Sequence, residues 1–219
     1  MKLRYPAGAT PLDAAALESL IPKLTTQREL NEFEAANVSE ADLWARRSRK
    51  IRRDLLTTAV LQELHRRMFD RTWRWAGVFR TSDTNLGVHW TQISVDVLNL
   101  SADTAYQIAN AVYPVDELAI RFHHRLVAIH PFPNGNGRHS RLATDALMRR
   151  LGAKAFSWGS ASLARDGAAR REYIASLKEA DNGAIQRLIR FARAELTRTR
   201  QQQDHDDDGD DQQQHRHPG

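Results

Sequence analysis

The amino-acid sequence predicts a mostly α-helical fold, and three observations favour that class. Apolar side chains recur at the i, i+3, i+4 spacing of a helix in several segments, as at Val60, Leu61 and Leu64. Thr26 and Glu29 have the spacing of a capping box, which marks the start of a helix. The 219 residues, of which 41% are hydrophobic and 27% charged, suffice for one soluble domain with a single core.

Each helix follows from its own pattern. The capping box begins a helix of about residues 25–37, and Ser39 is expected to cap a second helix that ends near Lys50. Another apolar stripe runs through residues 95–112 and consists of Val95, Leu98, Ala102, Ala105, Ile108, Ala109 and Val112. Further helices are predicted for residues 60–68, 118–130, 138–151, 166–180 and 183–198.

One segment, Val78–Trp90, departs from the helical pattern. Two short β-prone runs flank a middle rich in turn residues, which predicts a small β-hairpin. A lone hairpin is marginal unless it packs or pairs, so its edge is a candidate for strand addition by an extended peptide. The alternative is a hairpin that merely connects two helices.

Charge and composition divide the chain into a basic body and an acidic tail. Residues 1–200 hold 31 basic and 21 acidic side chains and are expected to form one domain, whereas residues 201–219 hold six Asp and one Arg. The tail has no apolar residue to bury, so we expect it to be disordered. The basic body favours polyanionic partners, namely nucleotide phosphates, nucleic acid or acidic proteins, and net charge does not choose among them.

The sequence also excludes several classes of site. It contains no cysteine, so disulfides, thiolate metal sites and cysteine nucleophiles are excluded. It has neither a P-loop pattern nor a His-Glu-x-x-His zinc pattern. No apolar run is long enough to span a bilayer, and Asp13 and Glu18 interrupt the stretch that a signal peptide needs. We therefore expect a cytoplasmic protein with no membrane partner.

The segment from His130 to Arg141 contains the candidate catalytic and phosphate-binding residues. Gly-Asn-Gly at 135–137 forms a tight loop before a helix, where backbone N–H groups and the helix dipole attract an anion. Arg138 and Arg141 are three residues apart and are expected to lie on one face of the first turn. His130 titrates near neutral pH and stands at the other end of the loop. This set suits transfer of a phosphate-containing group to a nucleophile that His130 deprotonates. The alternative is a plain helical corner, since Pro, Asn and Gly are turn residues, but that reading leaves the histidine and arginines unexplained.

This segment resembles the signature of the Fic (Fido) family. The match consists of His130, Phe132, Gly135, Asn136, Gly137, Arg138 and Arg141. Trp75–Arg80 and the segment after it look like the Fic flap. The span 1–200 is most similar to the Fic proteins called mobile mystery protein B, and this similarity depends on residues 20–27 and 121–139.

The resemblance implies a Fic-type helical bundle with a β-hairpin flap, and a protein adenylyltransferase. The enzyme would transfer AMP from ATP to a Ser, Thr or Tyr hydroxyl of a target protein and release pyrophosphate. His130 would take the hydroxyl proton, and Phe132 would anchor the loop. The nucleotide-binding residues would be Asn134, Gly135, Asn136, Gly137, Arg138 and Arg141, with both arginines also acting catalytically. The flap would align the target as an added strand through Thr81, Leu86, Gly87 and Val88.

Two positions depart from the family pattern. Asn134 stands where the family has an acidic residue that holds Mg²⁺, and a neutral amide binds this ion more weakly. Mg²⁺ is therefore expected with ATP, with Asn134 as a weak ligand. Thr25 and Glu29 match the start of the family's inhibitory helix, but Leu30 replaces its Gly or Asn. Glu29 is expected either to inhibit by pairing with Arg141 or merely to complete the capping box.

A competing hypothesis is a catalytically weak or silent basic protein that acts with a partner, on nucleic acid for example. Trp73, Trp75 and Trp90 lie near arginines in the sequence, but burial is the commoner role of tryptophan at such spacing, which disfavours nucleic acid. A pure binder would have no need to keep His130 together with Arg141. The subgroup resemblance also implies a helix-turn-helix partner protein.

Overall fold

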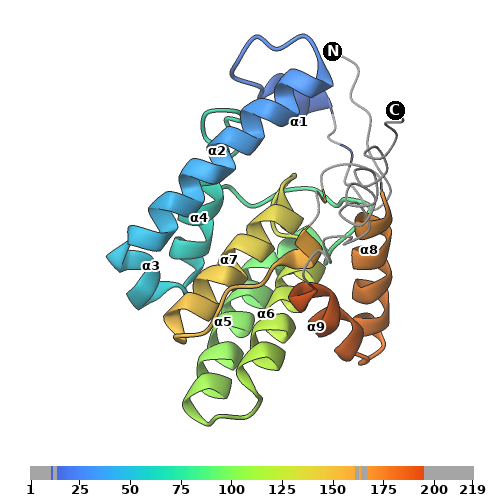
Figure 1. The fold of residues 1–219 in the computed structure, drawn as a ribbon. Helices are drawn as coiled ribbons and strands as arrows, with labels where there is room; N and C mark the ends of the chain where they lie inside the picture. Colours follow the sequence, from blue (N-terminus) through green and yellow to red (C-terminus); the bar gives the residue numbers. More distant parts are fainter. Residues whose placement is uncertain (1–10, 12–13, 161–162, 164–166, 195–219) are drawn as a thin grey trace, which may run out of the picture.

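In the computed structural model the chain is a bundle of helices (Figure 1), and the structure describes residues 11, 14–160, 163 and 167–194. The expected acidic tail, 201–219, lies outside these residues, as does the expected end of the domain at residue 200. The mostly helical prediction is confirmed. The described helices are α1 (Ala14–Glu18), α2 (Gln27–Arg47), α3 (Arg49–Asp54), α4 (Thr58–Phe69), α5 (Ile93–Ala109), α6 (Val115–Ile129), α7 (Asn136–Arg150), α8 (Ala168–Asp181) and α9 (Gln186–Arg193), with 3-10 turns at Trp90–Gln92 and Trp158–Ser160.

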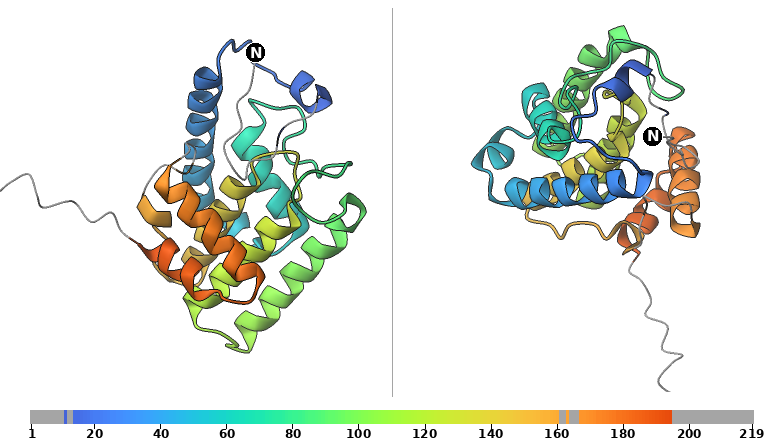
Figure 2. Two further views of the ribbon diagram at one scale, coloured as in Figure 1. Left: turned by 90° about the vertical axis from the view of Figure 1, so that its right-hand side faces the viewer. Right: turned by 90° about the horizontal axis from the view of Figure 1, so that it is seen from above.

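Helices α6 and α7 form the centre of the bundle. They pack against each other, and the short connection 130–135 joins them. Helices α2 and α4 pack on one side of this pair, α5 packs against α6, and α8 and α9 cover another side (Figure 2). The core between them is apolar and includes Leu64, Phe122, Leu126 and Leu147. None of the described helices is both long and apolar enough to cross a bilayer.

Helix α2 begins where the capping box places it but does not end at Asn37. The Thr26 hydroxyl accepts a hydrogen bond from Glu29 N, and the Glu29 carboxylate accepts one from Thr26 N. The expected cap at Ser39 is wrong, because its hydroxyl donates to the Ala35 carbonyl within one continuous helix. The break comes at Ser48, whose hydroxyl accepts from the backbone N–H three residues later and so caps α3.

Helix α5 forms as predicted, but its long apolar stripe is not the face that packs on the core. The buried side chains are Ile93, Val97 and Leu100, with Ser101 and Thr104. Val95 and Leu98 of the predicted stripe are exposed. The helix therefore has apolar residues on two faces.

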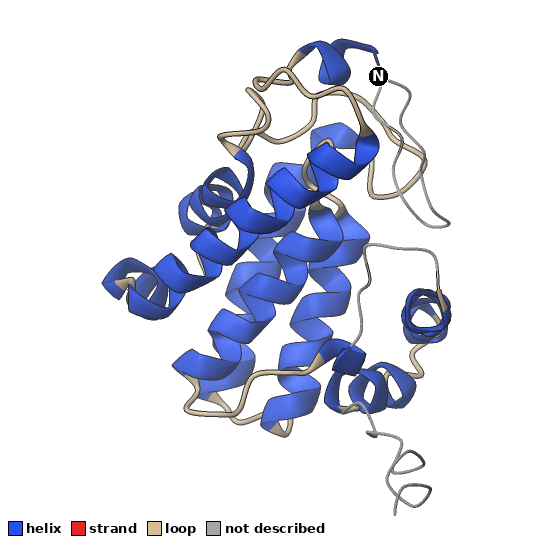
Figure 3. Cartoon of the chain, turned by 45° about the horizontal axis from the view of Figure 1, so that its top comes forward, coloured by secondary structure: helices blue, strands red, loops and turns tan. Residues whose placement is uncertain are grey.

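The predicted β-hairpin is wrong. Figure 3 shows no strand, and in the part of the chain that the structure describes the β pairing is limited to one bridge, Leu20 with Trp73. Residues 78–90 still fold back on themselves as a loop. The Arg80 guanidinium lies between the two arms and donates to the carbonyl oxygens of Ser82 and Val88. A side chain thus joins arms that a backbone ladder was expected to join.

Candidate active site

The connection 130–135 passes twice through the left-handed region of backbone conformation. His130 ends α6 with φ 54° and ψ 58°, and Gly135 precedes α7 with φ 78°. A Cβ atom at Gly135 would lie 2.6 Å from the Phe69 ring, so a larger residue would have to displace that ring. The loop therefore depends on glycine at 135 and holds a histidine in a strained conformation, as functional sites often do.

Phe132 and Asn136 hold this connection in one shape. Phe132 is fully buried, as expected, and stacks on His65 with ring centroids 3.7 Å apart. The Asn136 side chain accepts from Phe132 N at 2.9 Å and donates to the Phe132 carbonyl at 2.8 Å. Asn136 was expected to hold phosphate, but its amide group is occupied by the loop in this structure. In this structure it shapes the loop, and its role toward phosphate stays a prediction.

His65 is a site residue that the sequence did not reveal. Gly77 N donates to its Nδ1 at 3.0 Å, so Nε2 carries the proton and donates to the Asn134 carbonyl at 3.0 Å. Burial, with a neighbouring histidine, holds its pKa well below the usual value, so the ring is neutral. His65 therefore ties the active-site loop to the turn before the flap. The available signal was slight: one polar residue within the apolar stripe of α4.

His130, the expected general base, is nearly buried and neutral. Its side chain is nearly buried, and burial lowers its pKa to about 4; the Arg80 cation lowers it further and a hydrogen bond to the Val127 carbonyl opposes the shift. The ring is therefore neutral at physiological pH. The nitrogen that faces Val127 carries the proton, which leaves the lone pair of a base on the other nitrogen.

The flap, defined here as residues 78–90, lies directly on His130. Gly87 has φ 102°, and a Cβ atom there would stand 2.6 Å from His130 Cβ and 2.7 Å from Arg80 Nη2. Val88 N donates to the Ile129 carbonyl at 3.3 Å. Arg80 Nε donates to the His130 carbonyl at 2.8 Å. Arg80, which sequence reasoning also missed as a site residue, thus fixes the flap to the histidine.

The two arginines flank the start of α7 on different sides, not on one face. Arg138 Nη1 lies 2.7 Å from Glu34 Oε2 on α2, and its guanidinium lies over the Phe69 ring at 4.7 Å. The Arg141 guanidinium lies 5.5 Å from the centroid of the Tyr173 ring on α8. Two cations from α7 therefore border its N-terminus, one toward each neighbouring helix.

The N-terminus of α7 has the properties of an anion site. Gly135 is the N-cap and supplies no side chain to its amides. The first N–H groups of a helix have no partner inside the helix, and the dipole adds partial positive charge. A Cβ at Gly137 would meet Arg141 Nη1 at 3.5 Å, an ordinary contact, so the Arg141 guanidinium lies close to the start of α7. Phosphate is the kind of anion that such a helix start, bordered by two cations, favours.

Glu29 is a helix cap and does not pair with Arg141. Its carboxylate accepts from Thr25 N at 2.8 Å, the Thr25 hydroxyl at 3.0 Å and Thr26 N at 3.0 Å. These bonds lower its pKa to about 2. The expected inhibitory contact is thus absent from this structure, because the side chain is turned back on its own N-cap.

Another carboxylate of α2, Glu34, does pair with an arginine of α7, but this arginine is Arg138 and not the Arg141 expected for Glu29. It is buried, binds Arg138 through Oε2 and accepts from Trp73 Nε1 through Oε1 at 2.7 Å. No local pattern in the sequence marks Glu34 as a site residue, because its partners Trp73 and Arg138 are distant along the chain.

Asn134 offers a poor site for a resident metal ion. Its Oδ1 accepts from Gly135 N at 2.6 Å and lies 3.4 Å from Arg138 Nη2, so a cation there would be repelled. Among the described residues, no three His, Asp or Glu side chains gather as metal ligands. The protein residues alone therefore do not fit Mg²⁺ as a bound cofactor.

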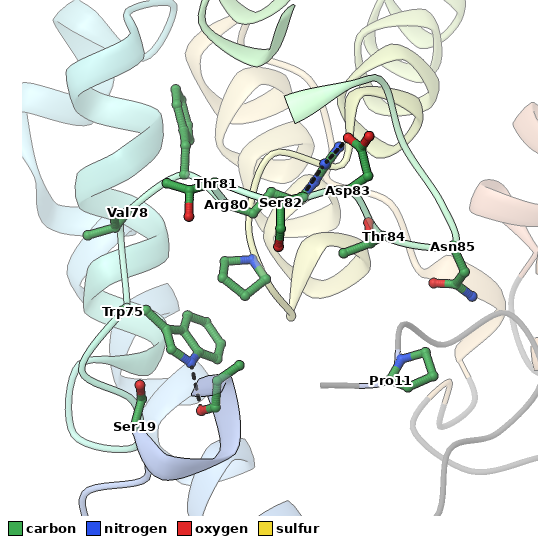
Figure 4. A pocket seen from close by; sticks show the side chains of 13 residues that line it. Pro11, Ser19, Trp75, Val78, Arg80, Thr81, Ser82, Asp83, Thr84 and Asn85 are labelled. Atoms are coloured by element: carbon green, nitrogen blue, oxygen red, sulfur yellow. Dashed lines mark hydrogen bonds and ion pairs between the residues drawn. The ribbon is translucent and has the colours of Figure 1, made fainter. Parts of the chain in front are cut away.

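A cavity of about 530 Å³ opens beside the flap (Figure 4). Trp75 forms one wall, and its Nε1 donates to the Ala16 carbonyl of α1 at 3.2 Å. Thr81, predicted as a flap residue, lines this cavity, whereas Leu86 is exposed at the tip of the flap. The lining residues are Pro11, Ala16, Ser19, Trp75, Val78–Asn85 and Pro133.

Comparison with known proteins identifies relatives of this architecture. The sequence profile of the Fic/DOC family matches residues 55–148. Protein adenylyltransferase Fic of Drosophila mojavensis is 30% identical over 141 residues, which are 62% of this chain and 26% of that protein. The chain thus spans about a quarter of the length of the curated relatives it matches.

Solved structures share the fold. Fic-1 of Caenorhabditis elegans superposes with a TM-score of 0.58 and 26% identity, covering 81% of this chain and 52% of that one. The N-terminal Fic domain of a Bartonella quintana effector, solved with bound ADP, gives a TM-score of 0.62 at 19% identity and covers 80% and 87% of the two chains.

Proposed function

We propose that this chain, in which the Fic/DOC profile matches residues 55–148, is a protein adenylyltransferase, which transfers AMP from ATP to a hydroxyl of a target protein. One observation carries the proposal. A neutral, nearly buried His130 lies under the flap, and the start of α7, which suits an anion, follows six residues later. The names of the relatives support the same reaction.

In the proposed reaction, His130, the first N–H groups of α7 and the two arginines each have a separate role. The target hydroxyl attacks the α-phosphorus of ATP while His130 Nδ1 or Nε2 takes its proton, and the bond to the leaving pyrophosphate breaks. The backbone N–H groups at the start of α7 hold phosphate oxygens in place. Arg138 and Arg141 balance the charge that builds up on the leaving pyrophosphate. Mg²⁺ enters with ATP as part of the substrate, since Asn134 alone holds the ion poorly.

The target protein is expected to approach over the flap. Gly87 and Val88 cover His130, so a target segment has to cross or displace them to bring its hydroxyl to the ring. The cavity beside Trp75 and Thr81 is large enough for a side chain that neighbours the modified residue. Its mixed lining of aromatic and hydroxyl groups suits a side chain with an apolar body and a polar end.

We propose that the resting enzyme is restrained by Glu34, whereas the sequence alone suggested Glu29. Arg138 cannot give both terminal nitrogens to phosphate while Nη1 is bound to the Glu34 carboxylate. The Glu34 side chain is buried and that of Arg138 is 31% exposed, so salt screens this pair less than an exposed one.

The similarity of residues 20–27 and 121–139 to mobile mystery protein B supports placing the chain in that subgroup. The corresponding proposals are a helix-turn-helix partner and a cytoplasmic location.

Labelling with α-³²P ATP tests the proposed activity. The protein is incubated with Mg²⁺ and a bacterial lysate, and labelled bands are compared with those of His130→Ala. We expect labelled protein with the wild type, a loss of about 10²–10⁴ in rate with the variant, and similar ATP binding by both. Equal labelling by the variant would exclude His130 as the base. Label from γ-³²P ATP instead would identify phosphate as the transferred group.

A further inference from the structure

A group of cations lies at the opposite end of α7 from the candidate active site. Helix α7 begins at the site and runs for about 22 Å before it ends beside α3. Figure 1 shows α3, at the left, near this end of α7. The cations come from the end of α2, from α3 and from the last turn of α7, and we call them the basic end: Arg46, Arg47, Arg49, Lys50, Arg52, Arg53, Arg149 and Arg150.

Two carboxylates neutralise part of this charge. Asp42 pairs with Arg46 and Arg149. Asp54 pairs with Arg53. In the part of the chain that the structure describes, no carboxylate pairs with the remaining five cations, all of which are exposed: Arg47, Arg49, Lys50, Arg52 and Arg150. Eight cations against two carboxylates leave a net charge of +6, which favours a polyanion as the partner of this surface.

Helices α3 and α7 bring these cations to one surface. The two helices pack against each other. A hydrogen bond from Arg53 lowers the pKa of the Asp54 carboxyl, and Lys50 of α3 and Arg150 of α7 lower it further. Lys50 and Arg150 therefore lie near the same carboxylate, although they are far apart along the chain. A single anionic segment is able to contact cations of both helices.

The sequence of this chain includes a polyanion of matching charge. Residues 204–211 contain six Asp among eight positions, and the other two are His205 and Gly209. This run has no Lys or Arg, so with His205 neutral its net charge is −6. The charges of the run and of the basic end are thus equal and opposite.

The described chain stops within reach of the basic end. The Ser157 hydroxyl donates to the Ala194 carbonyl at 2.8 Å, so this last described residue lies against the segment that follows α7. The seven peptide units from Arg150 to Ser157 span at most about 25 Å. The ten units from Ala194 to Asp204 span up to about 35 Å when extended. Asp204 is therefore able to reach Arg150.

We propose that the Asp-rich run 204–211 binds the basic end of its own chain and covers it. A tethered segment stays near its site at an effective concentration of the order of millimolar, which favours it over free polyanions. Each exposed Arg–Asp pair stabilises the contact only weakly, so binding is reversible and decreases with salt. Nucleic acid or an acidic protein then has to displace the run. This contact is independent of the proposed transfer reaction.

Carbodiimide coupling maps the contact in the full chain, because it joins a lysine amine to a carboxylate that touches it. The chain has five lysines, and of these Lys50 lies in the basic end. Lys178 of α8 is the control, since it is exposed and only a short turn and α9, about 12 Å long, separate its helix from Ala194. We expect the run to link to Lys50 at least about fivefold more than to Lys178 at about 0.01 M salt. This preference should vanish at about 1 M salt, where the Debye length is about 3 Å.

Two variants with the same net charge separate docking from general attraction. The first neutralises the basic end but keeps Lys50, and consists of Arg47→Gln, Arg49→Gln, Arg52→Gln and Arg150→Gln. The second removes four exposed arginines elsewhere, by Arg28→Gln, Arg74→Gln, Arg171→Gln and Arg190→Gln. We expect only the first to lose the preference for Lys50, with unchanged circular dichroism of both. Equal linking of Lys50 and Lys178 in the wild type, or the same loss in both variants, would overturn the proposal.

Two further measurements distinguish other occupants of the basic end. In a mixture of protein grown on light and heavy nitrogen, links within one chain carry a single isotope, and links between isotopes would place the run on another copy. A fluorescent DNA duplex should bind about tenfold more tightly at low salt when every Asp of 204–211 is changed (Asp→Asn), because the basic end is then uncovered. Mainly mixed-isotope links, or equal DNA affinity of this variant and the wild type, would contradict a run that covers its own chain.

Discussion

Replacing Gly87 with alanine should separate the flap from His130, the proposed general base. The new Cβ atom would stand 2.6 Å from His130 Cβ and 2.9 Å from the Ile129 carbonyl oxygen, whereas ordinary contacts begin at 3.4 Å. The flap or the histidine must therefore move by about 0.8 Å. Misplacement of a reacting group by about 1 Å costs on the order of 10²-fold in rate, so we expect a loss of that order in AMP transfer.

The backbone conformation contributes separately and needs its own control. Gly87 has φ 102°, where a side chain adds about 1–2 kcal/mol of strain that would lower stability by itself. Gly183→Ala is the matched variant, because Gly183 has φ 86° and a Cβ there meets nothing within 4 Å. We expect both variants to melt at lower temperature and only Gly87→Ala to lose transfer rate at unchanged ATP affinity. A Gly87→Ala enzyme as fast as Gly183→Ala would refute the close packing of the flap on His130.

Three further predictions concern charge. Glu34→Gln keeps an acceptor for Trp73 but frees Arg138, so ATP affinity measured by calorimetry should rise up to about tenfold. The control Glu29→Gln weakens only a helix cap, so it should lower the melting temperature and leave ATP affinity unchanged. Asn134→Asp should lower the Mg²⁺ concentration for half-maximal labelling, because it adds a charged oxygen ligand, and an unchanged value would place residue 134 away from the ion. Because the pKa of His130 is lowered to about 4, the folded state resists its protonation. Between about pH 6.5 and pH 4, His130 should lower the free energy of unfolding by up to about 1.4 kcal/mol per pH unit as the pH falls. The buried His65, His123 and His139, whose pKa values are also lowered, add to this slope. Urea titrations at several pH values measure this slope, and His130→Gln should reduce it.

The helices and the site loop could be predicted from the sequence because each depends on near neighbours. Helical periodicity and the capping box at Thr26 act within a few residues, and the segment His130–Arg141 is contiguous. The prediction of a cap at Ser39 was wrong because serine is common both at helix caps and inside helices. Inside a helix its hydroxyl donates to the carbonyl four residues earlier, and the sequence does not distinguish the two cases.

The residues that sequence reasoning missed act across long separations. Arg80 reaches the His130 carbonyl over 50 residues, His65 reaches Asn134 over 69, and Glu34 reaches Arg138 over 104. No local pattern marks such contacts, since each side chain is also plausible in an ordinary helix or loop. The hairpin prediction failed for the same reason: β propensity at 78–90 was read without knowing that a buried arginine would bind both arms.

Helix α5 shows that regular helical spacing of apolar residues does not by itself identify the face that packs on the core. Val95, Leu98 and Ala102 form the most regular apolar spacing in the segment, and periodicity alone would assign them to the core. The fold instead buries the opposite face, where Ser101 and Thr104 satisfy their hydroxyls by donating to carbonyls one turn earlier. A helix can bury such a face without loss because its polar groups are paired internally. The regular stripe is then left on the surface of the monomer, where Val95 and Leu98 are exposed.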